Sequence, residues 1–277
     1  MTAVLSRRAD VARGPVDLAV FEGGDPDGPT VLMVHGWPDT HHVWDRLAEL
    51  VHGDVRLVAY DTRGRGESVM AGPDDEFTLD LLAADLLAVV DAVSPDRPVH
   101  VVAHDWGSVQ AWEAVCRPEA ASRIASFASM SGPNLHHVTD WVRRTARRPA
   151  PRAVADLAGQ AVSSSYVPFL VSPLAPPVLG VLGNRDMVSG LRYYRANLGT
   201  GLDLWRRRPV ERRTSVPVLQ LALTRDPAVR PAALAASDRW TDTLERRPLP
   251  HGHWALTTHP DVIAEHVLEW VREHEPH

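Results

Sequence analysis

Short apolar runs that end in turn-forming residues alternate along the first half of the chain with segments of helical periodicity. Four such runs predict buried strands, at residues 31–34, 55–60, 99–103 and 124–130. Residues 77–93 carry leucine and valine at helical spacing and predict a helix that Thr78 caps, and residues 108–116 predict a second helix. Alternating strands and helices are typical of a parallel sheet covered on both faces.

The pattern weakens after residue 131 and recovers near residue 214. Residues 132–213 are rich in Arg and Pro and have weak periodicity, so they predict a helical cap inserted into a core made of residues 1–131 and 214–277. The second part of this core predicts a strand at 216–223, a helix at 238–244 and a C-terminal helix at 260–274. The predicted fold class is therefore α/β, with a mostly parallel sheet, helices on both faces and an inserted helical cap.

One stretch inside the predicted cap, residues 157–184, contains no charged residue and is long enough to span a bilayer. Four prolines, at positions 168, 173, 176 and 177, would break such a helix repeatedly. We therefore expect an apolar wall inside the protein and no stable membrane insertion. A membrane-docking surface is the alternative interpretation.

The composition narrows the function classes. The chain has 277 residues, 44% of them hydrophobic, and a formal net charge of −6 in which arginine supplies every positive side chain. Such a balance does not favour a nucleic-acid partner. The single cysteine, Cys116, cannot form an intramolecular disulfide, and Arg7 and Arg8 interrupt the region where a signal peptide would be apolar. We expect a cytoplasmic protein.

Several residue groups predict no specific ligand. We expect a solvated face of the cap at the arginines of positions 143, 144, 147, 148, 152 and 206–208. The histidines show no metal-binding spacing with acidic or thiol partners, and no glycine-rich phosphate loop follows a strand. No metal and no cofactor are therefore predicted.

Candidate chemistry gathers where predicted strands end. Residues 103–107 (AHDWG) follow one strand and open a helix, and the small residues Ala103 and Gly107 allow a tight turn that presents Asp105 alone above the sheet. Taken by itself, Asp105 could equally cap the helix. Further along, Asp226 follows a strand and His253 follows a turn, which gives the chain order nucleophile, acid, histidine of α/β-hydrolase sheets.

These motifs resemble those of epoxide hydrolases with the α/β-hydrolase fold, over nearly the whole chain. Residues 35–38 (HGWP) resemble the family's oxyanion-hole turn, residues 61–68 (DTRGRGES) a second family turn, and residues 104–107 (HDWG) the nucleophile elbow. Residues 252–254 (GHW) resemble the loop of the catalytic histidine. In the predicted cap, Tyr166 and Tyr194 stand in segments that resemble those of the paired ring-opening tyrosines.

The resemblance implies a catalytic set of Asp105, Asp226, His253, Tyr166 and Tyr194. Asp105 would form an ester with the substrate, and water activated by His253 would split it while Asp226 orients the imidazole. The backbone N–H groups of Trp37 and Trp106 would stabilise the oxyanion. Trp37 belongs to the turn that also includes His35 and Pro38. The side chains of Trp37 and Trp106 would line the pocket. Tyrosine is a suitable acid for the oxygen of an opening epoxide.

The predicted substrates are an apolar epoxide and water, because the uncharged cap segment suggests an apolar pocket. A haloalkane dehalogenase that uses the same aspartate is an alternative, with Trp106 holding the halide and Trp141 or Trp205 as a cap partner. A ligand-binding protein without turnover, built on the same scaffold, is a more distant one. A homodimer stays open.

Overall fold

The computed structural model describes residues 3–70, 72–183, 185–199 and 212–276. Its centre is an eight-stranded sheet in the order β1-β2-β4-β3-β5-β6-β7-β8. The strands are β1 (Ser6–Arg13), β2 (Val16–Gly24), β3 (Thr30–Val34), β4 (Arg56–Tyr60), β5 (Val99–His104), β6 (Ile124–Met130), β7 (Val218–Leu223) and β8 (Leu244–Leu249). β2 is antiparallel to β1 and β4, and the other neighbouring pairs are parallel. The carboxyl ends of the parallel strands therefore all lie at the same end of the strands, which is where active and binding sites form in sheets of this kind.

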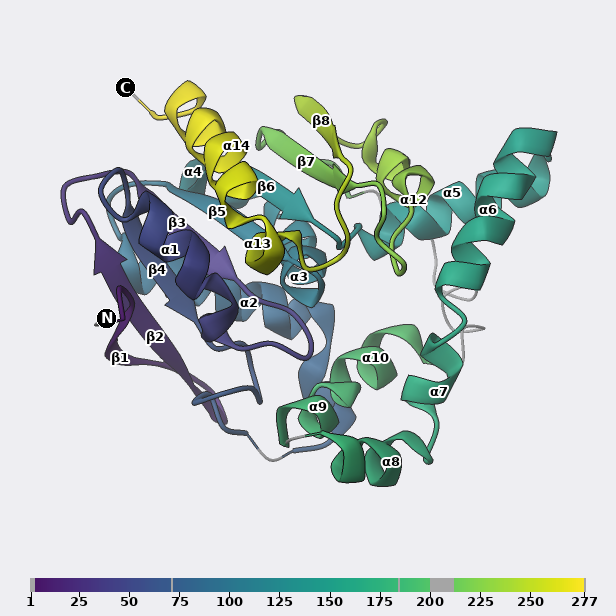
Figure 1. Ribbon diagram of the computed structural model, residues 1–277, viewed down its shortest axis with the longest axis horizontal. Coiled ribbons are helices and arrows are strands. Elements are labelled where there is room, and N and C mark those ends of the chain that lie inside the picture. The colour runs from purple at the N-terminus through teal and green to yellow at the C-terminus, as the bar shows by residue number, and fades with distance from the viewer. Residues whose placement is uncertain (1–2, 71, 184, 200–211, 277) are drawn as a thin grey trace.

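Two pairs of helices cover the two faces of this sheet (Figure 1). α1 (Asp45–Val51) and α14 (Pro260–Glu273) pack on one face, and α2 (Leu79–Val93) and α3 (Trp106–Val115) pack on the other. Val101 of β5 belongs to the apolar cluster of α2 and α3, whereas its neighbour Val102 belongs to that of α1 and α14. Successive strand residues point to opposite faces, so a strand covered on both sides has a nearly continuous apolar run.

A helical segment connects β6 to β7 and lies at one end of the sheet (Figure 1). Its helices are α5 (Leu135–Arg147), α6 (Pro151–Ser163), α7 (Val167–Val171), α8 (Ala175–Leu182), α9 (Arg185–Ser189) and α10 (Leu191–Leu198). The short elements elsewhere are η1 (His41–Trp44), η2 (Asp74–Phe77), α4 (Ala120–Arg123), α12 (Pro231–Leu234), η3 (Ala235–Ser237) and α13 (Ala255–Thr258). The side chain of Asn197 ties α10 to the sheet-covering layer, because its Oδ1 accepts the N–H of Leu79 at 2.8 Å and its Nδ2 donates to the carbonyl of Phe77 at 2.9 Å.

The predicted α/β class and most predicted elements are confirmed, but one helix is wrong. Residues 238–244 form a turn that leads into β8, and the helical residues lie just before it, at 231–237. β8 (LERRPL) is an edge strand with charged residues, so it has no apolar run from which a strand could be predicted. β1, on the opposite edge, is mostly exposed and was missed for the same reason.

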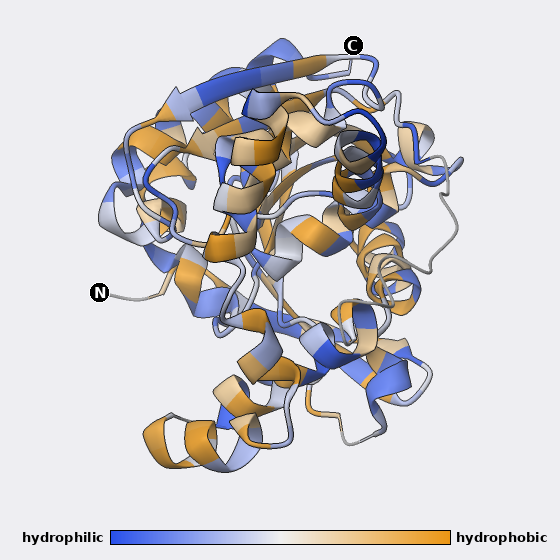
Figure 2. Cartoon of the chain, turned by 90° about the vertical axis from the view of Figure 1, so that its right-hand side faces the viewer, coloured by the Kyte–Doolittle hydropathy of each residue, from blue (hydrophilic) through white to orange (hydrophobic). Residues whose placement is uncertain are grey.

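The uncharged stretch of residues 157–184 is only partly the internal wall that the sequence predicts. Leu170, Ala175 and Leu179 are buried and belong to the core cluster. Val162, Leu174, Val178, Val181 and Leu182 are exposed. The prediction fails because the helices of this segment form a single layer, which has one side toward the sheet domain and the other toward solvent (Figures 1 and 2).

Candidate active site

Asp105 stands at the turn between β5 and α3, with a backbone conformation that L-amino acids rarely adopt. Its φ is 52° and its ψ is −126°. The turn is tight because α3 begins directly above β3: a Cβ atom on Gly107 would lie 2.1 Å from the carbonyl oxygen of Val34. Only glycine fits that position, as the sequence indicated for this turn. The conformation lifts the side chain of Asp105 out of the sheet edge.

Two backbone N–H groups face the carboxylate of Asp105. The N–H of Trp37 donates to Oδ1 at 2.7 Å, and the N–H of Trp106 makes a second hydrogen bond to the side chain. Gly36 permits this approach, because a Cβ atom there would lie 2.3 Å from Oδ1. Such a pair of donors can stabilise negative charge on an oxygen bonded to the carboxyl carbon.

His253 and Asp226 lie beside this carboxylate. The His253 Nδ1 and the Asp226 Oδ2 are 2.9 Å apart, and the His253 Nε2 is 3.7 Å from the Asp105 Oδ2. The other oxygen of Asp226 accepts the N–H groups of Ala228 and Val229, at 2.7 and 3.2 Å. The imidazole is therefore oriented with one nitrogen toward a fixed carboxylate and the other toward Asp105.

The loop of His253 is held from inside the sheet by His104. The Nε2–H of His104 donates to the carbonyl oxygen of His253 at 2.8 Å. Burial and the neighbouring imidazole of His253 lower the pKa of His104 to about 3, so this ring stays neutral. His104 therefore positions the histidine loop without carrying charge.

The pKa values of the three groups are coupled through charge and burial. Burial raises the pKa of Asp105, against the opposing effects of His253 and the two backbone donors. Burial acts to lower the pKa of His253, but the hydrogen bond to Asp226 and the negative charges of Asp105 and Asp226 outweigh it, so the net pKa is raised. For Asp226, burial opposes ionisation, yet its contacts with His253 hold the pKa below its usual value.

Tyr194 and Tyr166 approach the same carboxylate from the helical segment. The Tyr194 ring packs edge-on against the rings of Trp106 and Trp37, with centroids 4.9 and 5.5 Å away. Its hydroxyl makes hydrogen bonds with the Trp106 indole and with Tyr166. Burial and the nearby charge of Asp105 raise the pKa of Tyr166 to about 12, and the same two causes raise that of Tyr194 well above its ordinary value. Both hydroxyls are therefore protonated at neutral pH and can donate.

One cavity of about 560 Å³ joins these groups. Asp105, Trp106, Tyr166 and Tyr194 line it. Most of its other lining residues are apolar, namely Val109, Pro133, Leu135, Val138, Val167, Pro168, Val171, Leu198, Gly199, Ala228, Val229 and Ala233, with Ser131, Gln160 and Ser164 as the polar ones. Among the described residues that line it, Asp105 is the only one with a carboxylate or a basic group, so the cavity fits a neutral and largely apolar molecule.

The turn at residues 35–38 contributes its backbone more than its side chains. His35 is fully buried, its Nδ1–H donates to the carbonyl of Gly36 at 2.9 Å, and its Nε2 accepts the N–H of Thr62 at 3.0 Å. The Trp37 indole N–H donates to the carbonyl of Met187 at 2.9 Å. The expectation that the Trp37 side chain is free to line the pocket thus needs correction, because its indole ties the turn to α9. Pro38 follows a cis peptide bond, and its carbonyl accepts a hydrogen bond from Arg65.

Asp39 is a member of this neighbourhood that the sequence analysis missed. It follows the turn directly, and burial, together with the negative charge of Asp105, raises its pKa to about 6. Arg65 and His253 act in the opposite direction. One of its carboxyl oxygens, Oδ2, is buried without a hydrogen-bond partner. The sequence offered one signal, because Asp39 directly follows the turn of residues 35–38 that the resemblance assigns to the oxyanion hole.

Three further expectations concern groups outside the site. Tyr60 is fully buried, as predicted for a core residue. Cys116 is partly buried, and burial raises the pKa of its thiol to about 12, which makes it a poor nucleophile. Trp205 and the arginines at 206–208 lie outside the described residues.

The described residues contain neither a metal-binding cluster nor a membrane-spanning helix. Within the described ranges, no group of three or more His, Cys, Asp or Glu side chains could hold a metal ion. Among the helices that the structure describes, none has the length and apolar character needed to cross a membrane.

The chain is similar to a protein named as a probable oxidoreductase and to several proteins named as epoxide hydrolases. It is 36% identical over 295 residues to the probable oxidoreductase EphD of Mycobacterium tuberculosis, an alignment that covers 97% of this chain and 50% of that protein. It is 35% identical over 121 residues to epoxide hydrolase A of the same organism, covering 43% of this chain and 37% of that one. The chain thus spans about half the length of EphD.

Solved structures and a family model agree on the fold. An epoxide hydrolase from metagenomes of hot environments superposes with a TM-score of 0.77 at 21% identity, covering 97% of this chain and 99% of that one. An epoxide hydrolase of Bacillus megaterium has a TM-score of 0.74 at 20% identity, with 96% and 100% covered. The model of the alpha/beta hydrolase fold matches residues 29–260. With its sheet order and with Asp105 at the strand-to-helix turn, the chain belongs to the α/β-hydrolase fold family.

Proposed function

We propose that this protein hydrolyses apolar epoxides to vicinal diols through a covalent ester on Asp105. The observation that carries the proposal is the cavity at Asp105, which has a carboxylate from the sheet on one wall and two protonated tyrosines on the opposite wall. A carboxylate nucleophile needs a leaving group, and a strained ring oxygen that receives a proton is one that two phenols can assist. The names of the similar proteins support the same reaction class.

In the first step, an oxygen of Asp105 attacks an epoxide carbon, and the bond from that carbon to the ring oxygen breaks. The ring oxygen takes a proton from Tyr194 or Tyr166, which leaves a hydroxyl on the neighbouring carbon. The hydrogen bonds of the Tyr194 hydroxyl with the Trp106 indole and with Tyr166 would hold both phenols in place. The product of this step is a hydroxyalkyl ester of Asp105.

In the second step, His253 takes a proton from water, and the resulting hydroxide attacks the carboxyl carbon of Asp105. The oxyanion that forms is stabilised by the N–H groups of Trp37 and Trp106. When it collapses, the bond from the carboxyl carbon to the alkyl oxygen breaks, the alkyl oxygen takes the proton from His253, and the diol leaves. The proton that remains on the Asp105 carboxyl passes to the tyrosinate left by the first step, which restores the starting carboxylate and phenol. Forming the ester also removes the negative charge of Asp105 that helps to raise the pKa of His253, which lowers this pKa and favours the neutral imidazole that the base step needs.

The alternative of haloalkane dehalogenation has less support. A halide leaving group would need free indole N–H donors beside Asp105. The Trp37 indole donates to the carbonyl of Met187, and the Trp106 indole is engaged by Tyr194. An epoxide hydrolase uses the tyrosines directly, whereas a dehalogenase would have to displace them.

The test is a single turnover in heavy-oxygen water with aromatic and aliphatic epoxides and matched alkyl halides. We expect diol as the product and label in the peptide that contains Asp105, because the incoming water oxygen first enters the carboxylate. Released halide without diol would favour the dehalogenase. A ligand that binds without any product or adduct would favour a binding protein. A cytoplasmic location and a homodimer stay predictions.

A further inference from the structure

The outer side of the helical segment exposes large aliphatic side chains. Val181 is 85% exposed, Leu182 75%, Val162 74% and Leu174 66%. Soluble monomers rarely gather such side chains on one surface, so a contiguous group of them marks an interaction site. In Figure 1, α6, α7 and α8 follow one another along the rim of the molecule that is farthest from β1.

The helix α8 is apolar on both of its sides. Ala175 and Leu179, four residues apart, face inward and are buried. Val181 lies on the opposite helical side, whereas Val178 and Leu182 flank the buried pair, and all three are exposed. A helix that is hydrophobic all round belongs in an apolar environment on every side. Figure 2 shows α8, the lowest helix of Figure 1, as a largely hydrophobic element that projects from the body.

Positive charge brackets this uncharged stretch. Residues 132–199 contain eight arginines and three acidic residues, although the whole chain has a net charge of −6. Arg152 lies two residues before the exposed Val154 in the first turn of α6, and Arg185 follows α8 closely. Among the described residues, neither guanidinium forms an ion pair. The helical segment is thus the positive part of an acidic protein.

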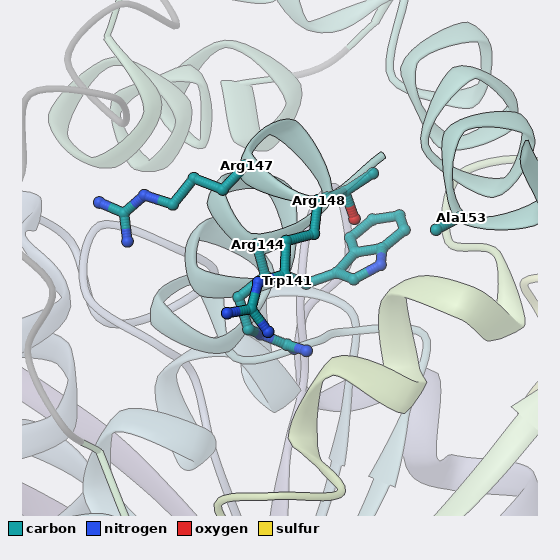
Figure 3. A pocket seen from close by; sticks show the side chains of 6 residues that line it. Trp141, Arg144, Arg147, Arg148 and Ala153 are labelled. Carbon is teal, nitrogen blue, oxygen red and sulfur yellow. The ribbon is translucent and has the colours of Figure 1, made fainter. Parts of the chain in front are cut away.

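A hollow at the junction of α5 and α6 adds to this positive surface. It has a volume of about 570 Å³ and is lined by Trp141, Arg144, Thr145, Arg147, Arg148 and Ala153 (Figure 3). No acidic side chain is among its described lining residues, although Arg144 pairs with Asp140 at 2.9 Å, and in Figure 3 the Trp141 indole lies toward Ala153 of α6. Tryptophan and arginine are the side chains that settle at the level of lipid headgroups, since each has an apolar body and a polar end.

We propose that this surface docks reversibly on an anionic phospholipid bilayer. The outer cap face, as we call it, consists of Val154, Val162, Leu174, Val178, Val181 and Leu182 together with Arg147, Arg148, Arg152 and Arg185. The aliphatic side chains enter the boundary of the acyl chains, and the arginines contact headgroup phosphates. A second copy of the chain fits less well, because a two-fold contact through this face would bring the unpaired arginines of both copies together.

The inner side of the same helices lines the substrate cavity, which connects membrane docking with substrate binding. Gln160, Ser164, Val167 and Val171, from α6, α7 and the turn that joins them, line the cavity at Asp105. A bilayer at the outer cap face would therefore lie one helical layer from the place where an apolar substrate binds. This consequence rests on the proposed function, whereas the docking itself does not.

The experiment is flotation of the full chain with vesicles, without any substrate. One set of vesicles contains phosphatidylglycerol and phosphatidylcholine, and the other contains phosphatidylcholine alone. We expect binding to the anionic set that weakens as salt is added, at least tenfold weaker binding for Val181→Glu/Leu182→Glu, and several-fold weaker binding for Arg152→Glu/Arg185→Glu. Leu50→Glu on α1 is the matched control for the first pair, because Leu50 is 50% exposed, and Arg46→Glu is the control for the second.

Two results would overturn the proposal. One is equal binding of the parent chain to the anionic vesicles and to phosphatidylcholine vesicles, or undiminished binding of both paired variants to the anionic vesicles. The other is a concentration-dependent dimer in sedimentation that Val181→Glu/Leu182→Glu dissociates, which would assign the face to a second copy. Activity of that variant on a water-soluble epoxide is measured separately, so loss of docking is distinguishable from failure of the proposed reaction.

Discussion

The carboxylate of Asp105 has two unlike neighbourhoods, one built on the sheet and one on the helical segment. On the sheet side, Asp226 and His253 follow β7 and β8, and every residue of β5 and β7 is buried. On the helical side, Tyr194 is buried between two indoles, but Tyr166 is 40% exposed and the neighbouring α6 has no buried residue. The sheet side is thus fixed by packing on both faces, whereas the helical side depends on a few aromatic contacts.

This difference separates the two steps of the proposed reaction. The helical side would supply the proton for ring opening, and the sheet side would supply the base and the oxyanion donors for ester hydrolysis. Substitutions on one side should therefore slow one step and leave the other nearly unchanged. Asp105 is shared, so its loss should remove both.

Asp105→Ala should have the largest effect. Without the carboxylate no ester forms, and we expect multiple-turnover activity on an epoxide to fall by about 10⁴-fold or more. Diol formation under saturating epoxide is the measurement, with thermal unfolding as the control for folding. Activity within tenfold of the parent would remove Asp105 as the nucleophile.

His253→Gln should impair only ester hydrolysis, the step that depends on the sheet side. The ester should still form, but its hydrolysis should slow by about 10²- to 10⁴-fold, the range that a general base contributes. A peptide heavier by one substrate mass at Asp105 should accumulate after one turnover, as seen by mass spectrometry. Undiminished repeated turnover would exclude His253 as the base.

Tyr194→Phe should break the helical side alone. We expect the rate of ester formation to fall by about 10²-fold, with no change in the hydrolysis of an ester already formed. Tyr193→Phe is a matched control, because the Tyr193 hydroxyl is buried and donates to the carbonyl of Arg63 at 2.6 Å. That control should lower stability but leave ester formation nearly unchanged. Equal rates of ester formation for Tyr194→Phe and the parent would remove Tyr194 from the mechanism.

The same contrast governs what could be predicted from the sequence. The turns after β5 and β7 could be located because these buried strands are mostly apolar and their ends carry the unusual residues. The edge strands β1 and β8 could not, since a strand with a solvated edge needs no such run. The hydrogen bond from the Trp37 indole to Met187 joins residues 150 positions apart, and no local pattern announces it.

Asp39→Asn should have a smaller effect, on the pH dependence of the sheet side. The negative charge of Asp39 helps to raise the pKa of His253, so its removal should lower that pKa. Ester hydrolysis needs the neutral imidazole, and its rate therefore rises with pH through the pKa of His253. The rising limb of the single-turnover hydrolysis rate should move to lower pH in Asp39→Asn. An unmoved limb, or one moved to higher pH, would mean that Asp39 does not act through His253.

The smallest expected effect is a difference in the free energy of unfolding, and it comes from the strained backbone of Asp105 on the sheet side. A φ of 52° with a ψ of −126° costs a residue with a Cβ atom about 1–3 kcal/mol, but glycine adopts it readily. Asp105→Gly and Asp105→Ala both remove the buried carboxylate, so their difference isolates the backbone contribution. We expect the glycine variant to have the larger free energy of unfolding, by about 1 kcal/mol or more, in urea denaturation. Ala84→Gly, within α2, should give the ordinary opposite order, since glycine in a helix is less stable than alanine by about 1 kcal/mol. If Asp105→Ala were the more stable variant, packing around the turn would relax the strain, and the rigidity assigned to the sheet side would not extend to its nucleophile.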